Sequence, residues 1–139
     1  MWKMMIIDDE YFVRMGIRET IDWVVHGVEI VGEADNGTQG LELACRLKPD
    51  IIITDIRMPG MNGLDFMRCC REKGLHSRII VLSAHEEFNY AKTALQQGAS
   101  DYLLKPVLNE QLIEAVLKAG RELSAEQAQA TYVEKLSRG

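Results

Sequence analysis

The sequence predicts one α/β domain built on a five-stranded parallel sheet, doubly wound so that helices cover both faces. Short apolar runs rich in β-branched residues recur about every 22 to 28 residues, which leaves room for one helix between successive strands. The third and fourth runs are apolar at successive positions, as in strands buried on both faces of a sheet. A chain of 139 residues, 47% of them hydrophobic, can bury one such core.

Strands are expected where the apolar runs lie. In chain order these runs are Met4–Ile7, Glu29–Val31, Ile51–Ile53, Arg78–Leu82 and Tyr102–Leu104. The segments between them carry apolar residues at helical spacing. Helices are therefore expected over residues 11–25, 38–47, 64–72 and 86–97, and from about residue 109.

The last stretch, residues 121–139, is rich in Ala, Glu, Gln, Lys and Arg, which favour a helix. Gly120 is expected to interrupt the preceding helix, and the apolar phase drifts beyond it. The sequence thus predicts a domain over residues 1–120 and a helical tail or linker over residues 121–139, leading toward an output domain that is absent here.

The composition argues against several functions. A net charge of −5 and a pI near 5.2 do not suit direct binding of nucleic acid. The apolar runs fall far short of the roughly 20 residues that span a bilayer, so no membrane partner is expected. Cys45, Cys69 and Cys70 lack metal-ligand spacing, and reduced thiols in a cytoplasmic protein are the expectation.

Polar residues follow or end four of the five predicted strands. They are Asp8, Asp9, Asp55, Ser83 and the pair Lys105-Pro106. The carboxyl ends of parallel strands meet at one edge of the sheet, where ligands bind in such folds. We therefore expect these side chains to converge, and a proline after Lys105 permits a cis peptide bond there.

Three clustered carboxylates repel one another unless one keeps a proton or a cation lies between them. Oxygen ligands with room for water suit Mg²⁺. With a lysine and a hydroxyl beside them, the set predicts phosphoryl transfer to a carboxylate nucleophile. Taken singly, Asp8 and Asp9 also fit a solvated turn, Asp55 a helix cap, and Ser83 an ordinary turn residue.

Three motifs together resemble the receiver domains of two-component response regulators. They are IDDE at residues 7–10, PDIIITDIRMPGMNG at residues 49–63 and ASDYLLKP at residues 99–106. The resemblance covers about residues 3–120 and implies a flavodoxin-like sheet with strand order 2-1-3-4-5. It also implies a sensor histidine kinase as phosphodonor, with self-phosphorylation and autodephosphorylation as the domain's only chemistry.

By this resemblance Asp55 is the phosphoacceptor. Mg²⁺ would be bound by Asp9, Asp55 and the backbone carbonyl of Arg57, with Asp8 holding a metal-bound water. Lys105 would bridge to the phosphoryl group.

The resemblance also implies a conformational switch. Ser83 would turn to hydrogen-bond the phosphoryl group, and Tyr102 would follow into the space vacated. The surface of the fourth helix, fifth strand and fifth helix would then change, which provides a possible homodimer contact. Serine replaces the commoner threonine at position 83 and keeps the hydroxyl.

A finer pattern resembles regulators with an AraC-type DNA-binding output. It consists of residues 14–18 (RMGIR), 21–23 (IDW) and 88–91 (FNYA). Transcriptional control is accordingly expected of a longer parent protein, and not of this domain.

Arg57 and His85 are expected to set the lifetime of the phosphoryl group. They stand two residues beyond Asp55 and Ser83, where they should border the approach of a hydrolytic water. Neither is a carboxylate or amide that would orient a water, and Arg57 is long enough to cover the phosphoryl group.

Three other functions are less consistent with this sequence. A hydrolase that resembles the haloacid-dehalogenase type would carry an Asp-x-Asp motif after the first strand, whereas here Asp8 and Asp9 are adjacent. A flavin binder would need a Ser/Thr/Gly-rich phosphate loop, and Asp8-Asp9-Glu10 would repel a phosphate. A docking module that works without phosphorylation would be expected to lack Asp55, Lys105 or one of the acidic pair.

Overall fold

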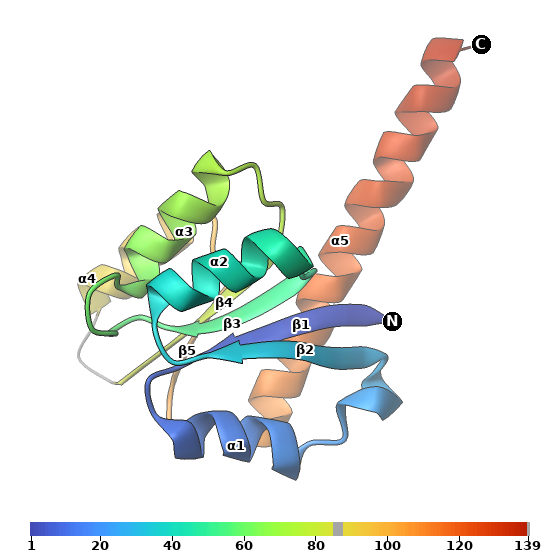
Figure 1. Cartoon of the computed structure of the whole chain (residues 1–139). Helices are drawn as coiled ribbons and strands as arrows, with labels where there is room; N and C mark the ends of the chain where they lie inside the picture. The colour runs from blue at the N-terminus through green and yellow to red at the C-terminus, as the bar shows by residue number, and fades with distance from the viewer. Residues whose placement is uncertain (85–87, 139) are drawn as a thin grey trace.

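The computed structural model describes residues 1–84 and 88–138, and its centre is a five-stranded sheet (Figure 1). The strands are β1 (Trp2–Ile7), β2 (Val28–Ala34), β3 (Ile51–Asp55), β4 (Arg78–Ala84) and β5 (Asp101–Lys105). Their order is β2-β1-β3-β4-β5, and each neighbouring pair is parallel. The predicted fold class and strand order are confirmed.

Helices cover both faces of the sheet (Figure 1). They are α1 (Tyr11–Thr20), the 3₁₀ helix η1 (Trp23–His26), α2 (Gly37–Leu47), α3 (Gly63–Glu72), α4 (Phe88–Gln96) and α5 (Asn109–Arg138). The side chains of Asn36 and Asn62 cap α2 and α3 by accepting hydrogen bonds from backbone amides three residues on, at 2.8 and 2.9 Å. None of the helices in the described ranges is long and apolar enough to cross a membrane.

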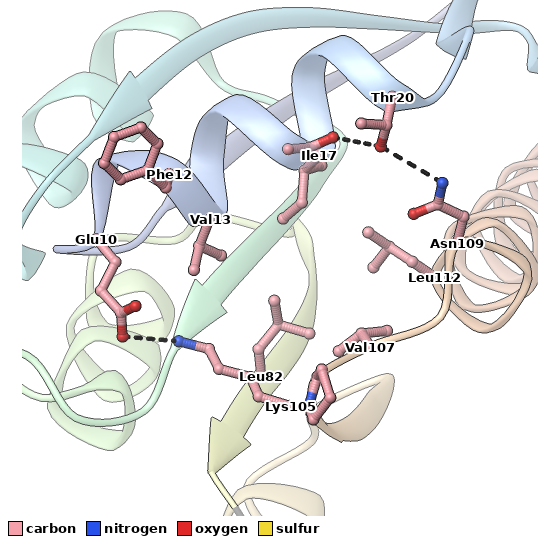
Figure 2. A pocket seen from close by; sticks show the side chains of 12 residues that line it. Glu10, Phe12, Val13, Ile17, Thr20, Leu82, Lys105, Val107, Asn109 and Leu112 are labelled. Carbon is pink, nitrogen blue, oxygen red and sulfur yellow. Dashed lines mark hydrogen bonds and ion pairs between the residues drawn. The ribbon is translucent and has the colours of Figure 1, made fainter.

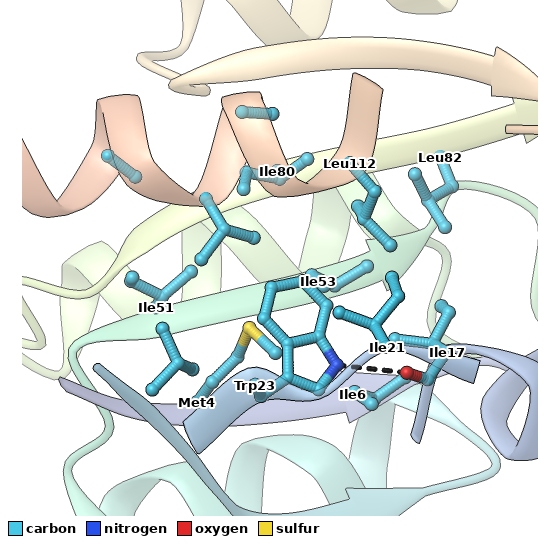
Figure 3. Close-up of a cluster of buried hydrophobic side chains, with 14 of the residues drawn as sticks. Met4, Ile6, Ile17, Ile21, Trp23, Ile51, Ile53, Ile80, Leu82 and Leu112 are labelled. Atoms are coloured by element: carbon cyan, nitrogen blue, oxygen red, sulfur yellow. Dashed lines mark hydrogen bonds between the residues drawn. The ribbon is translucent and has the colours of Figure 1, made fainter. Parts of the chain in front are cut away.

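The core lies in two layers because successive residues of a strand point to opposite faces. On β3, Ile51 and Ile53 enter the layer beneath α1 and α5, whereas Ile52 enters the layer beneath α2, α3 and α4. All three isoleucines are fully buried. Figure 3 shows the first layer closing around Ile53 and Trp23. The run of isoleucines therefore holds β3, and the residues that follow it, at the centre of the molecule.

The prediction of a first helix over residues 11–25 is wrong at its C-terminal end. The helix ends at Thr20, and Ile21 is extended, with φ −120° and ψ 130°. This break buries both Ile21 and Trp23, whose indole N–H donates to the Ile17 carbonyl at 2.9 Å (Figure 3). Val24 lies in η1 and is 64% exposed, so its agreement with the helical spacing was accidental.

Gly120 does not interrupt the last helix. α5 continues through it to Arg138, and Gly120 is buried where the helix crosses Trp2. A Cβ atom there would lie 2.8 Å from the indole nitrogen of Trp2, so glycine permits a close approach of helix and ring. Residues 124–138 are exposed; Glu126 still pairs with Arg78 of β4, and the end of the helix extends away from the domain (Figure 1).

Gly63 should be needed where α3 begins. A Cβ atom there would lie 2.7 Å from the Asp55 carbonyl oxygen and 2.9 Å from the Ile56 Cα atom, and these backbone atoms cannot easily yield. We expect Gly63→Ala to lower the free energy of unfolding by about 1–3 kcal/mol, measured by urea denaturation. The control is Gly16→Ala in α1, where nothing lies within 4 Å and alanine should add up to ~1 kcal/mol. Equal midpoints for Gly63→Ala and the wild type would contradict this packing constraint.

Candidate functional site

Three aspartates meet at the carboxyl edge of the sheet. Asp8 and Asp9 follow β1, and Asp55 ends the adjacent strand β3. Their carboxylates offer oxygen atoms that all lie within 4.8 Å of one another. Asp8 and Asp55 are buried, with 1% and 6% exposure, whereas Asp9 is exposed. The structure thus brings together the three acids that the sequence suggested.

Lys105 extends into this acidic cluster from the end of β5. Its Nζ atom lies 2.9 Å from an oxygen of Asp8, 3.3 Å from Asp55 Oδ2 and 3.8 Å from Glu10 Oε1. The peptide bond between Lys105 and Pro106, which the sequence allows to be cis, is cis in the structure. One ammonium group therefore faces several carboxylates.

The surroundings of this cluster raise the pKa values of both Asp55 and Lys105. Burial raises the pKa of Asp55, and nearby Asp8 adds to that rise, while the Lys105 charge partly offsets it. Burial by itself would lower the pKa of Lys105. The hydrogen bond and charge of Asp8, together with Asp55 and Glu10, outweigh burial and raise that pKa. Lys105 consequently stays charged, and the uncompensated negative charge favours a further cation.

A cavity of about 180 Å³ opens beside the acids, with Asp9, Asp55, Arg57, Ser83 and Lys105 among its lining residues. Ser83 is fully buried, and its hydroxyl donates to the Ala84 carbonyl at 3.0 Å. The space is large enough for several water molecules. It therefore has room for a hydrated cation beside Asp55.

The remaining predicted residues are Tyr102, Arg57 and His85, and of these Arg57 lines the cavity. Tyr102 is half-buried and pairs in register with Val81, so it shares a sheet face with Ser83, two residues further along β4. Arg57 is exposed, with its guanidinium carbon 5.9 Å from the ring centre of Tyr90 on α4. His85 lies outside the described residues.

A larger apolar groove of about 450 Å³ begins at the same edge, between α1 and the segment that follows β5 (Figure 2). Glu10 and Lys105 stand at one end of it, and Thr20 and Asn109 stand at the other, joined by a hydrogen bond of 3.4 Å. Phe12, on its rim, is 77% exposed. A molecule bound in this groove would reach the acidic cluster.

Two residues that shape the site were not among those that the sequence predicted for it. Glu10 faces Lys105, and Arg14 donates from its Nη1 atom to the backbone carbonyl of Asp8. Glu10 belongs to the IDDE motif, but the sequence predicted no role for it in the site. Arg14 has one turn of helix between it and that pair, and its position depends on Glu33 in β2, which no local pattern reveals.

The raised pKa of Asp55 predicts how stability depends on pH without metal. The folded domain holds this proton more tightly than the unfolded chain, so the contribution of Asp55 to stability falls as pH rises through its folded pKa. Asp55→Asn should therefore be more stable than the wild type at pH 7 in EDTA. The difference should shrink as pH falls toward the unfolded pKa. Urea unfolding at pH 7 and pH 5 measures it, and a less stable variant at pH 7 would show that attraction to Lys105 outweighs burial.

Known proteins resemble the chain along most of its length. The response regulator receiver domain family matches residues 4–117. The nitrate/nitrite response regulator NarL of Escherichia coli K12 is 44% identical over 115 residues, which are 83% of this chain and 53% of NarL. The transcriptional regulatory protein YesN of Bacillus subtilis, itself uncharacterized, is 37% identical over 123 residues, which are 88% of this chain and 33% of YesN. The chain thus spans about half or less of these relatives.

Solved structures of receiver domains are also similar to this chain. The receiver domain of AraT, a response regulator from Geobacillus stearothermophilus, has a TM-score of 0.84 at 44% identity, and the match covers 91% of this chain and 98% of that one. The family match, the two relatives and this structure all point to the same class of domain. The chain therefore belongs to the receiver domains of two-component response regulators.

Proposed function

We propose that the chain accepts a phosphoryl group on Asp55 from a sensor histidine kinase, with Mg²⁺ bound beside it, and that this changes the surface of α4, β5 and α5. The observation that carries the proposal is the meeting of three aspartates with Lys105 at one sheet edge. A docking module without phosphorylation would have no need of this crowded charge.

The donor set fits Mg²⁺. The cluster offers carboxylate oxygens, which hard divalent cations prefer, and the adjacent cavity has room for water. Asp9, Asp55 and the backbone carbonyl of Arg57 would hold the ion, with Asp8 acting through a bound water. When bound, Mg²⁺ neutralises charge on the phosphoryl oxygens.

The residues of the chain then have distinct roles in transfer. A carboxylate oxygen of Asp55 attacks phosphorus, a new O–P bond forms, and the bond from phosphorus to the donor histidine nitrogen breaks, with its electron pair staying on that nitrogen. Lys105, 3.3 Å from Asp55 Oδ2, attracts the incoming phosphoryl oxygens. The backbone N–H of Ile56 donates to Asp55 Oδ1 at 2.8 Å and orients the carboxylate.

The switch follows from the position of Ser83. Its hydroxyl is bonded to the Ala84 carbonyl and can turn toward a phosphoryl group on Asp55. Tyr102 shares its sheet face and lies on β5, the central strand of the surface that would change. A changed surface can then bind a second copy or a partner protein.

The proposal also includes partners of this domain. The groove beside α1 would receive part of the donor kinase, since it ends at Lys105. DNA would be bound by an AraC-type output in a longer cytoplasmic protein, and not by this domain. Turnover of a separate substrate is not part of the proposed activity.

Phosphorylation on Asp55 is tested with a small phosphodonor. Incubation with acetyl phosphate and Mg²⁺ should add the mass of one phosphoryl group, seen by intact mass spectrometry. Asp55→Asn or excess EDTA should prevent it, because the nucleophile or the neutralising cation is missing. Ser83→Ala is the control, since it should still be phosphorylated but lose the phosphorylation-dependent NMR shifts around Tyr102. Equal stable uptake by Asp55→Asn would refute the assignment.

The lifetime of the phosphoryl group is proposed to depend on Arg57. This side chain borders the cavity and is always charged, so it can cover the phosphoryl oxygens and exclude an in-line water. Arg57→Asn should speed the loss of phosphoryl after donor removal with Mg²⁺ present, since an amide can hold a water. Arg68→Asn on the exposed face of α3 is the matched control and should decay as the wild type does. Slower or equal decay in Arg57→Asn would assign the control of lifetime to another residue.

A further inference from the structure

We infer that Arg14 is a positioning residue that holds the turn carrying Asp8 and Asp9 in the orientation needed to bind a divalent cation. The inference rests on the proposed function, because it concerns the cation site of that function. Arg14 lies on α1, one helical turn beyond the acidic pair, and its side chain is 14% exposed.

Arg14 links the acidic turn to β2. Its Nη1 atom donates to the backbone carbonyl of Asp8, and its Nε atom donates to Glu33 at 3.3 Å. Arg14 binds the Oε1 atom of Glu33, whereas Arg18 donates from its Nη1 atom to the other carboxylate oxygen, Oε2, at 2.6 Å. Because the guanidinium is planar and rigid, Glu33 fixes the direction in which Arg14 meets the carbonyl.

The carbonyl that Arg14 binds belongs to the peptide group joining Asp8 to Asp9. The neighbouring parts of Asp8 are also held, since its amide donates to the Ala34 carbonyl at 3.1 Å and its carboxylate accepts from the Glu10 amide at 2.9 Å. Rotation of the joining peptide would move the exposed Asp9 carboxylate relative to Asp55. The hydrogen bond from Arg14 restricts that rotation.

Arg14 differs from Lys105 in what it leaves free. Lys105 binds the carboxylates themselves and thereby competes with a cation for their oxygens. Arg14 places positive charge near the acids but donates to a carbonyl, so the carboxylate oxygens stay open to a metal. Groups that orient metal ligands in this way commonly change metal affinity by about 10- to 100-fold when they are removed.

Arg18 provides a matched control. It lies on the same helix, carries the same charge and binds the same Glu33, but its hydrogen bonds go to Glu33 and Glu19. Arg18→Met therefore removes an arginine and its ion pairs with Glu19 and Glu33 without touching the Asp8 carbonyl. Comparison with Arg14→Met separates positioning of the acidic turn from a general effect of charge or stability.

The experiment is calorimetric titration of the whole chain with Mg²⁺. Arg14→Met should raise the dissociation constant about tenfold, whereas Arg18→Met should stay within about twofold of the wild type. Phosphorylation of Arg14→Met by acetyl phosphate should approach the wild-type rate at saturating Mg²⁺, because Asp55 and Lys105 are intact. Without metal, the NMR amide signals of Asp9 and Glu10 should shift in Arg14→Met and stay in place in Arg18→Met.

The outcomes distinguish the two proposals. A wild-type chain that binds no Mg²⁺ would refute the proposed function. If the wild type binds Mg²⁺ and Arg14→Met binds it as tightly as Arg18→Met does, the role of Arg14 is overturned. The proposed function then still stands. If Arg14→Met does not fold, Arg14→Lys is used, because one ammonium cannot hold Glu33 and the carbonyl in the same geometry. A several-fold loss of affinity in that variant supports the inference, and wild-type affinity overturns it.

Discussion

The crowding of negative charge at one edge of the sheet is the constraint on which the rest of this structure depends. Three carboxylates offer oxygen atoms within 4.8 Å of one another, two of them are buried, and Lys105 pairs with the two buried ones, Asp8 and Asp55. Such groups repel one another; burial raises the pKa of Asp55, and the nearby Asp8 carboxylate adds to that rise. The fold has to hold them together against that repulsion.

The sheet does this through its parallel register and its apolar interior. β1 and β3 are adjacent, so their carboxyl ends bring Asp8 and Asp55 side by side. The buried isoleucines of β3 fix that strand in both core layers, and α3 begins against the backbone of Asp55 and Ile56. Because Asp55 ends β3 and Asp8 directly follows β1, the geometry of these two acids exists before any cation arrives, which limits the reorganisation needed on binding.

The sequence predicted the features that depend on local patterns. Apolar runs and their spacing predicted the strands, and the polar residues after them predicted which side chains would meet. The errors occurred where distant contacts decide. Trp23 is buried by breaking α1, and Gly120 lies inside a helix because Trp2 packs against it. The link from Glu33 to Arg14 likewise joins β2 to α1, and no short motif contains both residues.

The proposed reaction changes the charge at this edge in one direction. Three carboxylates, Lys105 and a divalent cation together are close to neutral. Conversion of Asp55 to an acyl phosphate removes one carboxylate charge and brings about −1.5 to −2 charges on the phosphoryl group, so the edge gains up to about one negative charge. The Ser83 hydroxyl, on the neighbouring strand β4, is a donor that can turn toward this charge. Tyr102 lies on the same sheet face, so under the proposed function a change at Asp55 on β3 would pass through β4 to β5.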